Sequence, residues 1–203
     1  MEKTTSSGYL EIILGPMFSG KTSKLIEIYK RYKCCDDVHV LAINHSDDTR
    51  HANATTQMTS HDQHLFINCI QSETIRHIID TNIETLSTGN TQKPIVVLIN
   101  EGQFFQDLQE GVTELVNTYH AHVYVAGLDG DFKREKFGQM LDLIPMCDKV
   151  YKLHSLCVVC KNGTKAIFSH RTMTACTEQK KIGAEDLYQP LCRECFESMN
   201  SSI

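Results

Sequence analysis

Short apolar runs alternate with longer amphipathic stretches along the first three-quarters of the chain. The apolar runs cover residues 10–14, 38–43, 95–100, 123–126 and 149–153. A continuous apolar run such as residues 95–99 is typical of a strand that is buried on both faces of a parallel sheet. The alternation therefore predicts an α/β fold, in which helices cover both faces of an open parallel sheet.

The amphipathic stretches predict helices between these strands. One helix is expected over residues 19–33, with an apolar stripe of Leu25, Ile28, Tyr29 and Tyr32. A second stripe contains Leu108, Val112, Leu115, Val116 and Tyr119. Two polar segments interrupt the rhythm. Residues 44–63 are expected to form a lid, and residues 85–94 are expected to form a surface linker.

Length and composition indicate one main domain with a small appendage. The chain has 203 residues, of which 41% are hydrophobic, and we place the boundary between residues 1–150 and 151–203. No apolar run reaches the roughly 18 residues of a membrane span, and residues 1–7 lack a signal-peptide core. We therefore expect a cytoplasmic protein. The net charge of −5 gives no global electrostatic reason to bind nucleic acid or an anionic membrane.

The most informative motif directly follows the first predicted strand. It is a full match to the phosphate-binding P-loop pattern and consists of Gly15, Pro16, Met17, Phe18, Ser19, Gly20, Lys21 and Thr22. An ordinary glycine turn can match the same pattern, but the preceding strand and following helix favour nucleotide binding. The glycines let backbone N–H groups surround an anion, Lys21 supplies a cation, and the Thr22 hydroxyl can ligate Mg²⁺.

Four of the nine cysteines form two C-x-x-C pairs, namely Cys157, Cys160, Cys192 and Cys195. Two such pairs form a tetrahedral thiolate site for Zn²⁺. Because four sulfurs leave no open coordination position, we expect the zinc to be structural. The other five cysteines have no partner spacing and are expected to be free thiols.

A second candidate group stands at the end of the strand predicted over residues 95–100. A P-loop needs a carboxylate partner beyond a neighbouring buried strand, and Glu101 is the acid in that position. Its carboxylate can act as general base on an attacking hydroxyl. Asn100 cannot supply negative charge, but its carbonyl oxygen can hold a metal-bound water.

Taken together, these residues resemble the type II thymidine kinases of cells and large DNA viruses. The resemblance runs from about residue 9 to residue 196. It rests on the P-loop, on Asp-Thr-Arg at 48–50, on Ser-His-Asp at 60–62, on Glu-Gly-Gln-Phe-Phe at 101–105 and on Leu-Asp-Gly-Asp-Phe at 128–132. It also includes the cysteine pairs and the segment 182–188 between them, which is similar to the family's lasso loop.

The resemblance implies a RecA-like P-loop domain and a zinc-ribbon lobe that carries the lasso. It implies transfer of the γ-phosphate of ATP to the 5′-hydroxyl of thymidine with Mg²⁺, for deoxynucleoside salvage and DNA synthesis. Homotetramers and feedback inhibition by dTTP are further properties that the family suggests. Glu101 would be the catalytic base. Beyond residues 15–22, the implied ATP-binding residues are Asp48, Thr49, Arg50, Asn100, Gly102 and Gln103.

The resemblance also implies a site for the thymine base. Its side chains would come from Met17, Leu128, Phe132, Phe137 and Tyr188, and its lasso contacts from Gln179, Lys180, Lys181, Ile182 and Gly183. An isolated phenylalanine is more often core packing than a ligand contact. Residues 133–136 are expected to form a solvated face, with Arg134 near phosphate.

Two departures from the family pattern keep alternatives open. Ala184 stands where the family has a second glycine, and Asn100 stands where the family has an aspartate. The main hypothesis is therefore a thymidine kinase, and the alternatives are a P-loop kinase for another deoxynucleoside and a weakly active nucleotide-binding relative. A nucleic-acid module is a further alternative, but acidic residues dilute the basic ones around the cysteines and no aromatic series accompanies them.

Overall fold

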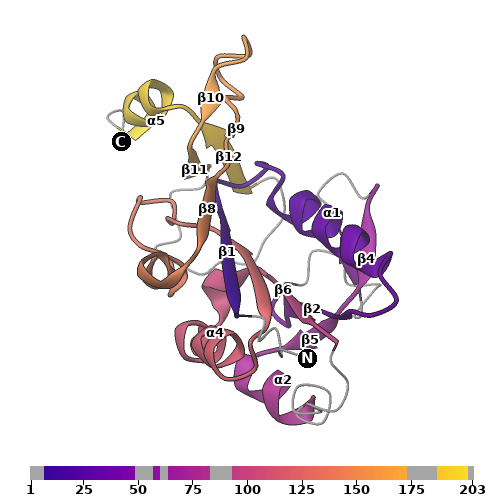
Figure 1. Cartoon of the computed structure of the whole chain (residues 1–203). Coiled ribbons are helices and arrows are strands. Elements are labelled where there is room, and N and C mark those ends of the chain that lie inside the picture. Colours follow the sequence, from indigo (N-terminus) through magenta and orange to yellow (C-terminus); the bar gives the residue numbers. More distant parts are fainter. Residues whose placement is uncertain (1–6, 49–56, 60–63, 83–92, 173–186, 201–203) are drawn as a thin grey trace.

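The computed structural model describes residues 7–48, 57–59, 64–82, 93–172 and 187–200. At its centre lies a six-stranded sheet of order β5-β2-β6-β7-β1-β8, in which every strand pair is parallel (Figure 1). The strands are β1 Tyr9–Leu14, β2 His39–His45, β5 Ile70–Ser72, β6 Ile95–Asn100, β7 His122–Gly127 and β8 Lys149–Lys152. The predicted α/β fold with a parallel sheet is confirmed.

Side chains alternate along each central strand and bury both faces of the sheet. On β6, Val97 and Ile99 belong to one core cluster, whereas Val96 and Leu98 belong to the other. Helices α2 (Ile75–Thr81) and α4 (Leu108–Asn117) and a 3₁₀ segment (Met140–Met146) contribute to the first cluster. The second face is covered by helix α1 (Lys21–Lys33) and by the hairpin of β3 (Gln57–Thr59) and β4 (Phe66–Asn68).

The strand order decides which loops meet. Strand β7 lies between β1, which leads into the P-loop, and β6, which leads into Glu101. Because the strands are parallel, the segments that follow β1, β2, β6, β7 and β8 all emerge at one edge of the sheet. Ligands of open parallel sheets bind outside this edge.

A small lobe stands at the end of the sheet where β8 finishes (Figure 1). It contains β9 (Ser155–Leu156), β10 (Lys165–Ala166), β11 (Phe168–Arg171), β12 (Tyr188–Leu191) and α5 (Arg193–Asn200). Its strands form two antiparallel pairs that are separate from the main sheet. The core consists of Cys157, Ala166, Leu191, Cys192 and Phe196, which is small for an independent unit.

The structure also corrects parts of the sequence analysis. The polar segment 44–63 is not irregular throughout, because β2 continues to His45 and residues 57–59 form β3. Residues 49–56 and 60–63 of the expected lid lie outside the described ranges, and so do residues 83–92, which include most of the expected linker. Short β5 and α2 were not predicted, since each contains few residues. No helix in the described part of the chain is both long and apolar enough to cross a membrane.

Gly111 allows α2 and α4 to pack closely. A Cβ atom at this position would lie 2.5 Å from Cγ2 of Ile75. We predict that Gly111→Ala lowers the free energy of unfolding by about 1–2 kcal/mol, because overpacking outweighs the gain in helix propensity. Urea unfolding measures this. Glu110→Ala, on the exposed side of the same helix, is the control, and an equal or higher stability of Gly111→Ala would contradict the prediction.

Candidate active site

The P-loop has the backbone geometry that an anion site requires. Gly15 and Gly20 have φ angles of 153° and 82°, and Phe18 has a φ of 63°. A Cβ atom on Gly15 would lie 2.8 Å from the carbonyl oxygen of Leu153, so only glycine allows this approach to the end of β8. Helix α1 starts at Lys21, so the last two residues of the P-loop motif form the first turn of the helix. The loop therefore combines inward-turning backbone with the positive end of a helix.

Polar side chains of the loop are suited to phosphate. The Lys21 ammonium is buried and donates a hydrogen bond of 2.8 Å to the carbonyl oxygen of Pro16. The Ser19 hydroxyl is buried and has no hydrogen-bond partner among the described residues. A buried polar group without a partner needs a physical explanation, and a ligand in the loop provides one.

Glu101 stands immediately after β6 in a left-handed backbone conformation, with φ of 53° and ψ of 41°. This conformation costs a non-glycine residue roughly 1 kcal/mol and is found more often at functional sites. The carboxylate is only 7% exposed, and its Oε2 accepts a hydrogen bond of 2.6 Å from Nε2 of Gln103. The strained backbone thus places a buried carboxylate at the edge where the P-loop lies.

Gln103 links this carboxylate to the loop that follows β7. Its Oε1 accepts a hydrogen bond of 2.9 Å from the backbone N–H of Leu128. Gly138, with a φ of 56°, lies so close that a Cβ atom would be 2.2 Å from the carbonyl oxygen of Gln103. The Gln103 amide therefore fixes Glu101 and Leu128 relative to each other.

The P-loop and the end of β6 are joined by a direct side-chain contact. The Thr22 hydroxyl donates to Oδ1 of Asn100 over 3.2 Å. Asn100 in turn donates to Asn44 at the end of β2, and Asn44 donates to Asp48. These side chains bring several oxygen atoms together, and oxygen is the ligand atom that Mg²⁺ prefers. The sequence analysis missed Asn44, although a polar residue just after the predicted strand 38–43 was a usable signal.

The residues expected around the base are brought together in part. Phe137 is buried and packs against Phe104 in a T-shaped, edge-to-face contact, with ring centroids 5.7 Å apart. The half-buried ring of Phe132 lies 3.8 Å from the guanidinium of Arg171. Nε and Nη2 of Arg171 donate to the Tyr188 hydroxyl over 3.1 and 2.5 Å. Arg171 therefore connects two expected base contacts.

Met17 of the P-loop contacts the small lobe. Its backbone N–H donates a hydrogen bond of 3.0 Å to Oγ of Ser169 on β11. Sequence reasoning missed Ser169 and Arg171, because neither belongs to a motif. Both are buried, whereas Phe168 and His170 between them are less buried, so strand periodicity was the available signal. Thr49, Arg50 and the lasso residues 179–183 lie outside the described ranges.

The four predicted zinc ligands form one cluster. Their sulfur atoms all lie within 4.8 Å of one another, and Sγ of Cys160 is 3.7 Å from that of Cys192 and 3.5 Å from that of Cys195. A tetrahedron of Zn–S bonds of about 2.3 Å has edges of about 3.8 Å. Burial opposes ionisation of the Cys157 thiol, but backbone N–H groups from both knuckles lower its pKa to about 6. The cluster therefore fits a structural metal ion such as zinc.

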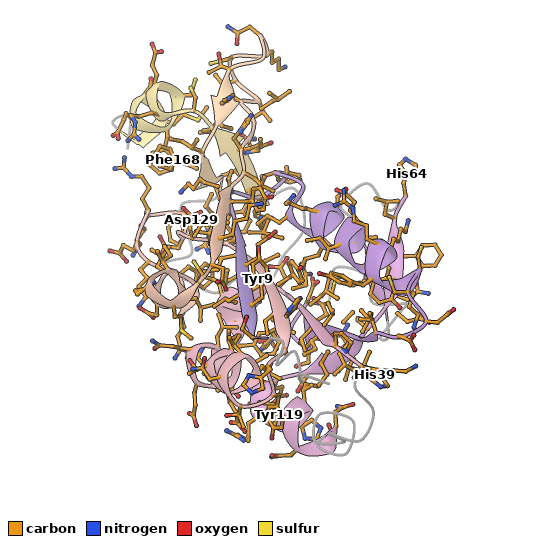
Figure 2. The ribbon with its side chains drawn as sticks, in the orientation of Figure 1. Tyr9, His39, His64, Tyr119, Asp129 and Phe168 are labelled. Carbon is orange, nitrogen blue, oxygen red and sulfur yellow. The ribbon has the colours of Figure 1, made fainter. Side chains whose placement is uncertain are left out.

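Arg134 holds the small lobe against the main sheet. Its guanidinium pairs with Glu197 on α5 and lies 4.9 Å from the ring centroid of Phe196 and 5.5 Å from that of Phe168. Figure 2 shows Phe168 in the small lobe, with Asp129 below it near the end of the sheet. Residues 133–136 are exposed as expected, but Arg134 contacts the small lobe, and the expectation that it lies near phosphate finds no support in these contacts.

Removing this contact should loosen the lobe. We predict that Arg134→Ala weakens docking by about 1–2 kcal/mol, because both the ion pair and the cation–π contacts are lost. Hydrogen exchange of the α5 and β11 amides measures this, and they should exchange faster. Lys133→Ala, which removes a positive charge from the residue before Arg134, is the control. Equal exchange rates in the two variants would contradict a role for Arg134 in docking.

Comparison with known proteins agrees with this geometry. A family model described as thymidine kinase matches residues 8–196. The chain is 36% identical to a thymidine kinase of Raccoon poxvirus over 191 residues, which is 94% of this chain and 98% of that protein. It is 34% identical to a thymidine kinase of Yaba monkey tumor virus over 195 residues, 96% of this chain and 98% of that protein.

A cellular relative matches over a similar length. The cytosolic thymidine kinase of Gallus gallus is 33% identical over 189 residues, which is 93% of this chain and 77% of that protein. The residues that the family model matches include the P-loop, the Glu101 segment and the four clustered cysteines. The chain belongs to the thymidine kinase family.

Proposed function

We propose that the protein transfers the γ-phosphate of ATP to the 5′-hydroxyl of thymidine. The observation that carries this proposal is the position of the buried Glu101 carboxylate near a P-loop. Thr22 of the P-loop forms a hydrogen bond with Asn100, the residue that precedes Glu101. Family membership supports the substrate pair. The proposed role is deoxynucleoside salvage for DNA synthesis, in the cytoplasm.

ATP would lie with its phosphates in the loop formed by residues 15–22. Backbone N–H groups and Lys21 would neutralise the phosphate charge, and Asp48, Thr49, Arg50, Asn100, Gly102 and Gln103 would complete the site. Thr22 and Asn100 would hold Mg²⁺ or its bound water, and the ion would screen charge on the phosphates. Phosphoryl transfer depends mainly on such positioning and charge neutralisation, so this set of groups suffices.

Glu101 would act on the acceptor. Its carboxylate would take the proton of the 5′-hydroxyl as that oxygen forms a bond to the γ-phosphorus. The bond between this phosphorus and the oxygen bridging to the β-phosphate breaks in the same displacement, and ADP leaves with that electron pair. The hydrogen bond from Gln103 would hold the carboxylate in place for the proton transfer.

The nucleoside would lie between the main sheet and the small lobe. Its base would contact Met17, Leu128, Phe132, Phe137 and Tyr188, together with the lasso residues 179–183. The hydrogen bond from Met17 to Ser169 and the stacking of Arg171 on Phe132 support this location, because they connect the lobe to the P-loop and to the loop after β7. Zinc in the four-cysteine cluster would fix the stems of the lasso.

The remaining proposals concern organisation. We divide the chain into an ATP-binding domain of residues 1–150 and a zinc lobe of residues 151–203, in agreement with the separate core of the lobe. A homotetramer and feedback inhibition by dTTP are further proposals, based on the family alone.

The first test concerns the proposed base. We predict that Glu101→Gln lowers kcat by about 10²–10⁴-fold and leaves ATP affinity unchanged, because the amide cannot accept the proton. Transfer of labelled γ-phosphate to thymidine, deoxyuridine, deoxycytidine and deoxyguanosine measures both rate and acceptor preference. Glu11→Gln, at a carboxylate that is equally buried but pairs with Tyr9, is the control. Full activity of Glu101→Gln would exclude its role as base, and preference for another nucleoside would identify a different deoxynucleoside kinase.

The second test concerns the zinc lobe. We predict that Cys192→Ser loses the metal and weakens thymidine binding by about tenfold or more, while ADP binding changes little, because the P-loop belongs to the main sheet. Zinc analysis and calorimetry with each ligand measure this. Cys147→Ser, outside the cluster, is the matched control. Unchanged thymidine affinity after metal loss would contradict the proposed role of the lobe.

A further inference from the structure

Four polar side chains form a continuous hydrogen-bonded chain at the carboxyl edge of the sheet. Asn100 and Asn44 are direct partners in the register of β6 and β2, and each is 2% exposed. Nδ2 of Asn100 donates to Oδ1 of Asn44 over 2.9 Å, and Nδ2 of Asn44 donates to Oδ2 of Asp48 over 3.0 Å. At the other end, the Thr22 hydroxyl donates to Oδ1 of Asn100 over 3.2 Å.

The charge at one end of this chain determines the orientation of both amides. A carboxylate only accepts hydrogen bonds, so Asn44 must turn its NH₂ group toward Asp48. Its oxygen then faces Asn100, and Asn100 must donate a hydrogen bond to that oxygen from its own NH₂ group. As a result, the carbonyl oxygen of Asn100 faces Thr22 and the P-loop.

This orientation matters for a cation. Thr22 and Asn100 together present oxygen atoms, which Mg²⁺ and its bound waters require. A reversed Asn100 amide would aim two N–H groups, with their partial positive charge, at the same place. An asparagine at the end of β6 is therefore compatible with a metal site only if its orientation is fixed.

We propose that Asp48 and Asn44 are positioning residues that hold the Asn100 oxygen toward the P-loop, and that the chain thereby compensates for the lack of a carboxylate at position 100. The inference rests on the proposed function, since it concerns the metal that accompanies ATP. The negative charge lies two side chains away from the position where the resemblance expects it, and the Asn44–Asn100 contact transmits its effect.

The test measures how much Mg²⁺ strengthens nucleotide binding. Calorimetry gives the Kd of ADP with EDTA and with Mg²⁺, and their ratio is the magnesium factor, which does not depend on turnover. We predict that Asp48→Asn lowers this factor about fivefold, the size expected for one hydrogen bond, because no anion then orients the amides. The Kd in EDTA shows whether the P-loop itself is intact.

We call the hydrogen-bonded connection from Asp48 through Asn44 to Asn100 the relay. A variant that moves the negative charge along this connection tests it specifically. In Asn44→Asp/Asp48→Asn the carboxylate moves one position along the chain and still accepts from Asn100, so the magnesium factor should return to within about twofold of wild type. Asp47→Asn is the control, because it removes the neighbouring acid, whose side chain is 37% exposed and pairs with His45. The control should keep the wild-type factor.

The outcomes separate the relay from the proposed function. A wild-type factor in Asp48→Asn overturns the relay, and so does a double variant as impaired as the single one, which would mean that Asp48 acts by direct contact with the ligand. If wild-type protein neither binds ADP more tightly with Mg²⁺ nor phosphorylates any nucleoside, the proposed function fails and the relay fails with it.

Discussion

The parallel register of the central sheet is the constraint on which the site depends. It places Asn44 opposite Asn100 and brings the ends of β1 and β6 to one edge, on either side of β7. Side chains alternate between faces, so a slip of one residue in β6 would turn Asn100 away from α1 and Thr22. The apolar residues on both faces hold this register, because any slip would disrupt both cores. The hydrophobic core thus fixes the polar contacts of the site.

The small lobe is stabilised differently. Its own core is small, and the four cysteines make up a large part of it and of its surroundings. Docking to the main sheet uses contacts of different kinds, including a backbone hydrogen bond from Met17, the stacking of Arg171 on Phe132 and the ion pair of Arg134. These contacts involve the P-loop and the loop after β7. The nucleoside site would therefore be assembled from both parts and would depend on how the lobe is held.

The role of Asn100 depends on its surroundings in the fold. In the sequence it is a neutral residue where an acid is expected, which suggests weak metal binding. In the structure it is the middle of a hydrogen-bonded chain that ends in the Asp48 carboxylate. A neutral side chain held in one orientation by a nearby charge offers its oxygen atom to a cation without adding a buried charge of its own, which would be costly to desolvate.

The strands, the P-loop and the cysteine cluster were predictable because each is specified by residues close together in sequence. Residues 12–14 and 95–99 are continuously apolar, the P-loop needs its glycines at fixed spacing, and each C-x-x-C pair aims two sulfurs at one point. Short elements such as β3, β4 and β5 carry too few residues for a periodic pattern.

The contacts between distant segments came only from the tertiary structure. Strand order, the pairing of Asn44 with Asn100, the reach of Arg134 to Glu197 and the bond from Met17 to Ser169 join residues far apart in the chain. Sequence alone determined which groups this protein has for chemistry and roughly where each strand and helix lies. The packing of strands in register decided which of those groups meet, because a hydrogen bond depends on distance and direction, and neither is encoded by local spacing.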